Sequence, residues 1–101
     1  MWLLYGKPAS GRVIVDAGAA LALRGKGSLL PVGIIGVEGD FVAGDAVTVV
    51  DGNGVELAKG LVSYSREELD RIKGLQSARV AEMLPDASPE AIHRDYLVLV
   101  C

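Results

Sequence analysis

The hydrophobic positions fall into short runs separated by glycine and polar residues, which predicts several brief strands rather than a few long elements. Residues 12–15 (RVIV) form the first run, and a β-branched stretch follows over residues 29–37. The clearest strand signal is a hairpin, because residues 47–50 and 55–58 flank the turn sequence DGNG at residues 51–54. These turn residues tolerate a positive φ, as tight hairpin turns require.

Further strand character follows the hairpin and returns at the C-terminus. Residues 60–64 prolong the second hairpin strand, and Gly60 is expected to form a bulge or kink there. Residues 91–93 and 96–100 resume a β pattern. We therefore predict a mainly β fold with short helices, in which five or six strands form a compact, partly closed barrel.

Two short helices are predicted from their N-terminal caps. Asp16 is placed to cap an alanine- and leucine-rich helix over residues 17–23, which the glycine-containing segment after it ends. Ser65 and Glu68 form a capping box, in which each side chain bonds a free backbone N–H at the start of a second helix. Gly74 is expected to stop that helix.

A third helix is predicted over residues 77–84. It presents Val80, Met83 and Leu84 on one face, and Pro85 ends it because proline cannot continue a helix.

Composition adds a question about the surface. The chain of 101 residues has the length of one domain, half of its residues are hydrophobic, and the mean hydropathy is +0.37. Only 5% are aromatic, so the core must be aliphatic. Two interpretations stay open: a tightly packed aliphatic core, or an apolar surface that a partner or a further domain covers.

The N-terminal residues indicate that this sequence is a piece of a longer chain. The run Trp2, Leu3, Leu4 and Tyr5 follows Met1 directly, and we interpret these four side chains as candidate interdomain contacts. Residues 1–10 are then a linker or the remnant of a first strand, and residues 11–101 are the domain. The run is too short for the core of a signal peptide, and no stretch of the chain is long enough for a membrane span.

Charge and cysteine usage narrow the function classes. The single cysteine, Cys101, has no partner within the chain, which excludes an internal disulfide and fits a reducing cytoplasm. The formal net charge of −3 and the pI near 5.0 argue against a dedicated nucleic-acid binder. Cys101 and the distant His93 lack an orienting group, so they make no nucleophilic pair.

Two short motifs imitate kinase chemistry and fail at defined positions. His93-Arg94-Asp95 resembles a protein-kinase catalytic loop, but Val100 occupies the position of the metal-binding Asn. We expect His93 to fix a loop, and Arg94 and Asp95 to pair with neighbours. The sequence therefore predicts no catalytic residue of this kind.

The segment GKGS at residues 25–28 resembles a phosphate loop. Ala20 occupies the position of the first glycine, and Gly27 that of the Ser or Thr. A helix stop is the main interpretation of this segment. The alternative is a cradle in which Arg24, Lys26 and Ser28 contact a phosphodiester.

The remaining charged residues indicate no further chemistry. Asp40, Asp45 and Asp51 stand in turns, where aspartate forms local hydrogen bonds, and no metal site is predicted. In the first third of the chain the cations outnumber Asp16, so an anionic partner would favour that part. These cations are Lys7, Arg12, Arg24 and Lys26.

Six segments in order resemble the PUA domain, in the version found at the C-terminus of bacterial glutamate 5-kinases. They are GRVIVDAGA (11–19), SLLPVGI (28–34), GDFVAGD (39–45), GLVSYS (60–65), IKGLQS (72–77) and IHRD (92–95). The resemblance implies a pseudobarrel of about six strands with short helices. It also implies a parent enzyme that uses ATP and magnesium to phosphorylate the side-chain carboxylate of glutamate, which opens proline biosynthesis.

The residues of that reaction belong to an upstream amino-acid-kinase domain, so none is carried onto this chain, which needs no cofactor of its own. The resemblance thus implies an accessory domain with an architectural, assembly or regulatory role, whose partners are the upstream domain and further copies of the parent. PUA domains elsewhere bind RNA with their first helix and a neighbouring loop, here about residues 17–28. RNA binding is therefore the alternative, and a third reading is a free-standing accessory protein of RNA modification.

Overall fold

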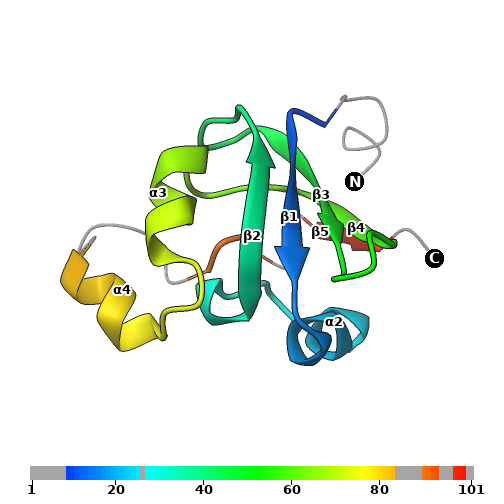
Figure 1. The fold of residues 1–101 in the computed structure, drawn as a ribbon, viewed down its shortest axis with the longest axis horizontal. Helices are drawn as coiled ribbons and strands as arrows, with labels where there is room; N and C mark the ends of the chain where they lie inside the picture. Colours follow the sequence, from blue (N-terminus) through cyan, green and yellow to red (C-terminus); the bar gives the residue numbers. More distant parts are fainter. Residues whose placement is uncertain (1–8, 26, 84–89, 94–96, 100–101) are drawn as a thin grey trace.

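The computed structural model describes residues 9–25, 27–83, 90–93 and 97–99, and folds them into a five-stranded mixed sheet with short helices around it (Figure 1). The strand order is β2-β1-β3-β4-β5. The elements are β1 (Gly11–Val15), α2 (Ala17–Arg24), the 3-10 turn η1 (Pro31–Gly33), β2 (Ile34–Gly39), β3 (Ala46–Val50), β4 (Glu56–Leu61), α3 (Arg66–Ile72), α4 (Ser77–Met83) and β5 (Leu97–Leu99).

Strand β1 lies inside the sheet and has one antiparallel neighbour, β2, and one parallel neighbour, β3. Val13 is opposite Val37 of the antiparallel β2 and opposite Val49 of the parallel β3. Antiparallel pairing then continues from β3 to β4 and from β4 to β5. Since paired residues share one face of a sheet, the row through Val13, Val49 and Ala58 is directed inward, and all three side chains are fully buried.

The core is mainly aliphatic, as the composition predicted, and Phe41 and Tyr64 add two aromatic side chains to it. Among the described residues no charged side chain is buried. An isolated bridge between Leu29 and Ile92 links two segments outside the strands, and both side chains are fully buried. The largest fully buried side chains are Tyr64, Leu23, Leu29, Ile34, Leu69, Ile72 and Ile92.

The predicted hairpin is confirmed, and local bonds explain its turn. Asp51 Oδ1 accepts from the N–H of Asn53 at 2.8 Å and from that of Val55 at 3.0 Å. Gly54 has a φ of 82°, which glycine adopts without strain. The bulge predicted at Gly60 is wrong: Gly60 pairs with Val47 within β4, and the register shifts between Val49 and Val50, next to the turn.

The capped helices are also confirmed. Asp16 caps α2, and Ser65 and Glu68 form the capping box at the start of α3. The positive φ of Gly74, 77°, follows the end of α3. Asp45 forms the expected local bond, since its Oδ2 accepts from the N–H of Val42 at 3.1 Å.

Two local predictions need correction. Residues 31–33 were expected to be extended, but they form η1, which Pro31 begins because its ring fixes φ and it needs no N–H partner there. The predicted helix over residues 77–84 is observed as α4, in which the side chain of Val80 is buried and that of Met83 is 46% exposed. Residues 91–93 were expected to form a strand, but Ile92 alone forms an isolated bridge, with Leu29.

Several predictions fall on Leu84, Pro85, Arg94, Asp95 and Cys101, which lie outside the described residues. Within the described part, no helix is long and apolar enough to cross a bilayer.

Candidate docking site around helix α2

Helix α2 is held by its ends and by a single buried side chain. At its start Asp16 Oδ1 accepts from the N–H of Ala19 at 2.8 Å. At its end the N–H of Gly25 donates to the carbonyl of Leu21 at 3.2 Å. Leu23 is the buried residue of the helix, at 1% exposure, and anchors it to the core.

The solvent face of α2 is almost free of polar side chains. Ala17, Gly18, Leu21 and Ala22 are exposed, and Arg24 supplies the only charge of the helix. A surface helix ordinarily presents charged and polar residues on this face. The face of α2 therefore has the character of a surface that another molecule covers.

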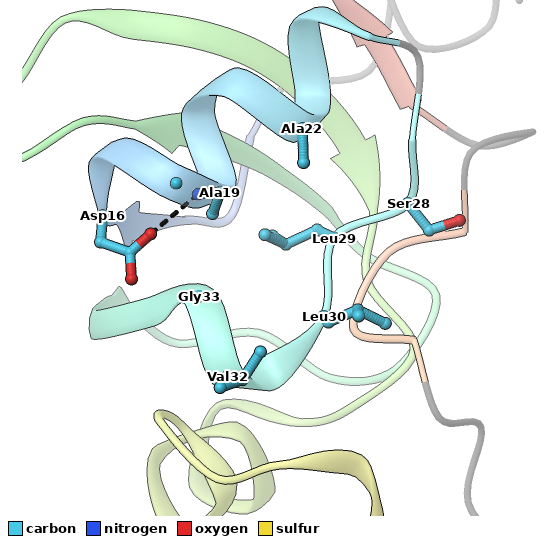
Figure 2. A pocket seen from close by; sticks show the side chains of 9 residues that line it. Asp16, Ala19, Ala22, Ser28, Leu29, Leu30, Val32 and Gly33 are labelled. Carbon is cyan, nitrogen blue, oxygen red and sulfur yellow. Dashed lines mark hydrogen bonds between the residues drawn. The ribbon is translucent and has the colours of Figure 1, made fainter.

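One hollow lies between α2 and the segment that leads into η1 (Figure 2). Its volume is about 310 Å³, and Figure 2 shows Ala19 and Ala22 of the helix directed toward Leu29 and Gly33 across it. The lining residues are Asp16, Gly18, Ala19, Ala22, Ser28, Leu29, Leu30, Val32 and Gly33.

A second hollow, of about 480 Å³, is lined by α2 together with β2 and the β3–β4 turn. Leu21 and Ile35 line it, and these side chains are 68% and 55% exposed. The lining residues are Val15, Asp16, Ala17, Ala20, Leu21, Arg24, Ile35, Asp51, Gly52 and Asn53.

The structure separates two of the predicted phosphate contacts. Arg24 lines the second hollow and Ser28 the first. In Figure 2 the Ser28 hydroxyl points away from α2. Asp16, an anion, lines both hollows. Arg24 and Ser28 thus line different hollows, and Lys26 lies outside the described residues, so the cradle of Arg24, Lys26 and Ser28 stays a prediction.

The candidate interdomain contacts Trp2, Leu3, Leu4 and Tyr5 also lie outside the described residues, so they stay predictions. Sequence reasoning missed four exposed apolar side chains beside α2, namely Leu21, Leu30, Val32 and Ile35. The signal for Leu21 was present, because the helix sequence AGAALALR has a polar residue only at its last position.

Ionisable groups with shifted pKa values lie on other elements. Burial, and after it the carboxylate of Glu68, raises the pKa of Tyr64 above 10.0. A hydrogen bond and ion pair with Lys73 lowers the pKa of Asp70. His93 Nε2 lies 3.8 Å from Glu90 Oε1. None of these groups lines a hollow beside α2, and the described residues contain no cluster of three metal-ligating side chains.

The fold is a five-stranded mixed sheet of the PUA type, with α2 directly after the first strand and a hollow on each side of this helix. The model of the PUA domain family matches residues 11–84, so the chain belongs to this family. A solved PUA domain from Aeropyrum pernix, in a tartrate complex, superposes with a TM-score of 0.63 at 25% identity, over 83% of this chain and 41% of that one.

The relatives point to one particular protein. Glutamate 5-kinase from Synechocystis is 47% identical over 97% of this chain. The match covers 27% of that enzyme, so this chain spans about a quarter of the length of the curated relatives it matches. An archaeal box H/ACA small ribonucleoprotein structure shares the fold, with a TM-score of 0.58 at 20% identity, over 85% of this chain and 26% of that one.

Proposed function

We propose that this PUA domain is the non-catalytic accessory domain of a glutamate 5-kinase. The observation that carries the proposal is the 47% identity to such an enzyme over 97% of the chain. The parent would phosphorylate the side-chain carboxylate of glutamate with ATP and magnesium in the cytoplasm, as the first step of proline biosynthesis. Its catalytic residues would lie in an upstream amino-acid-kinase domain.

The apolar surroundings of α2 support an architectural or regulatory role. Leu21, Ile35, Val32 and Leu30 are all more than one-third exposed and line the two hollows. Exposed apolar side chains that gather in this way mark surfaces for protein contacts. The domain would therefore contribute to assembly or feedback control of a homo-oligomeric parent.

Deletion of residues 11–101 from the parent tests this role. We expect the shortened enzyme to keep ATP-dependent phosphorylation of glutamate, while its oligomeric state or its inhibition by the pathway's end product changes. A parent with Arg79→Ala, an exposed position of α4 that lines neither hollow, is the control. Unchanged assembly together with unchanged inhibition would refute the proposed role.

RNA binding is the second candidate. The box H/ACA neighbour is a ribonucleoprotein, and Arg24 forms no ion pair with any residue that the structure describes. The geometry favours it less, because Arg24 and Ser28 line different hollows and Asp16 lines both. A dedicated phosphate site would gather its cations.

A titration with structured RNA at low salt separates the two candidates. Phosphate contacts release counterions, so binding through this segment must weaken steeply as salt rises. The charge-reversed variant Arg24→Glu/Lys26→Glu should then lose most of the affinity. Absence of binding, or equal binding by this variant, rules RNA out as a ligand of the segment.

A further inference from the structure

Residues around the second hollow form a surface that we call the α2–turn surface, defined by Ala20, Leu21, Arg24, Ile35 and Asp51. It combines a protruding apolar side chain and a hollow on one patch. Leu21 is 68% exposed at the rim of a hollow of about 480 Å³. A twofold axis through such a patch places the protruding side chain of each copy in the hollow of the other.

The charges on this surface are self-complementary as well. Arg24 stands on the helix side of the hollow and Asp51 on the turn side. The two hydrogen bonds that the Asp51 carboxylate accepts within the described residues both use Oδ1, so Oδ2 can accept from a donor on another molecule. The same twofold axis brings Arg24 of one copy to Asp51 of the other and forms two equivalent charge pairs.

The surface lies away from the start of β1. Figure 1 shows α2 at the end of β1, whereas residues 9 and 10 lead into the opposite end of this strand. The N–H of Ser10 bonds the carbonyl of Ala46 at 2.8 Å and holds this segment against β3. Residues 9 and 10 therefore do not cover the α2–turn surface.

We propose that the α2–turn surface pairs two copies of this domain about a twofold axis. Leu21 enters the hollow beside Ile35 of the other copy, and Arg24 pairs with its Asp51. The surface is small. Because a standard interface buries about 800 Å² from each partner, a contact confined to the residues of this one hollow is expected to be weak.

Sedimentation equilibrium of this chain over a range of concentrations tests the pairing. We expect a monomer–dimer equilibrium with a Kd of about 0.1 to 1 mM and at least about a tenfold weaker dimer for Leu21→Asp. Val42→Asp is the matched control, because Val42 is 61% exposed but lies in the β2–β3 connection, outside the α2–turn surface. This control should dimerise like the unmodified chain.

Charge variants test whether Arg24 of one copy faces Asp51 of the other. Arg24→Glu should weaken the dimer, since it places two anions together, and Asp51→Asn should weaken it while the amide oxygen keeps the turn. Arg79→Glu, on the exposed face of α4, is the matched control for Arg24→Glu. Thermal unfolding confirms that each variant is folded.

Three outcomes would overturn the proposal: a monomer at about 1 mM, a dimer that Leu21→Asp leaves intact, or equal weakening by Val42→Asp. A monomeric chain whose Leu21→Asp variant instead loses binding to the upstream kinase domain or to RNA would assign the surface to that partner. These outcomes do not depend on the parent enzyme, so they are separate from the test of the proposed function.

Discussion

Gly33 shows how one missing side chain shapes the site at the residue scale. A Cβ at this position would lie 2.5 Å from the Cβ of Ala19 in α2, much closer than atoms in contact allow. The absence of a side chain therefore lets η1 pass beneath the helix. Both residues line the first hollow, so this contact sets its width.

We predict that Gly33→Ala lowers the free energy of unfolding by about 1–3 kcal/mol, the cost of forcing a methyl group into a packed site. Gly52→Ala is the control, because a Cβ there meets nothing within 4 Å. Urea denaturation measures both. Equal stability of the two variants would show that α2 shifts freely and that the contact does not hold it.

Tyr64 gives a pH-dependent prediction at the same scale. Its side chain is 1% exposed, and burial followed by the charge of Glu68 raises its pKa above the value of 10.0 for a free phenol. A raised pKa means that the folded state keeps the proton longer than the unfolded state. Its contribution to stability is complete below pH 10.0 and is lost as pH rises toward the folded pKa.

Urea denaturation at increasing alkaline pH should therefore show falling stability. Tyr64→Phe removes the group that titrates, so the stability of this variant should decline less steeply above pH 10.0. Parallel pH curves for the two proteins would show that Tyr64 does not cause the alkaline loss.

At the scale of elements, the short helices depend on caps. Helix α3 has seven residues, too few to be stable alone in water. The N–H of Glu68 donates to Ser65 Oγ at 3.2 Å, and the N–H of Ser65 donates to Glu68 Oε1 at 3.1 Å. Leu69 and Ile72 are fully buried and bind the capped helix to the core.

Removal of the cap by Ser65→Ala should cost about 0.5–2 kcal/mol of unfolding free energy, since it leaves a backbone donor unpaired. Ser63→Ala is the matched control, because Ser63 is exposed and its backbone N–H, which the substitution keeps, donates to the carbonyl of Ala91. Chemical denaturation compares the two. A loss for Ser63→Ala as large as that for Ser65→Ala would contradict the assignment of the cap.

The same scale shows which features the sequence could predict. The caps at Asp16 and Ser65 and the turn at Asp51 rest on side chains that bond backbone groups within four residues, so local sequence was sufficient. The register shift at Val50 depends on pairing across the sheet, which local sequence does not determine.

The candidate site was predicted only in outline for a similar reason. Residues 17–28 were placed correctly as a helix and the segment after it. Arg24 and Ser28, however, line different hollows, and the sequence alone did not indicate this. The exposed neighbour Ile35 comes from β2 and joins the surface only through the fold.

At the scale of the whole molecule, α2 with its apolar surroundings lies at one end of β1, and residues 9 and 10 lead into the other end of that strand (Figure 1). The end that carries α2 can therefore contact another molecule without involving residues 9 and 10. This arrangement suits an accessory domain whose boundaries we predict at residues 11–101, after a linker over residues 1–10.

The central claim is that this domain belongs to a glutamate 5-kinase, and the native polypeptide tests it most directly. Mass spectrometry of the natural protein that contains these residues should find an amino-acid-kinase domain upstream. This chain should make up about 27% of the whole, as it does of the Synechocystis relative. A natural protein that consists of this domain alone, or that joins it to an RNA-modifying enzyme, would contradict the account.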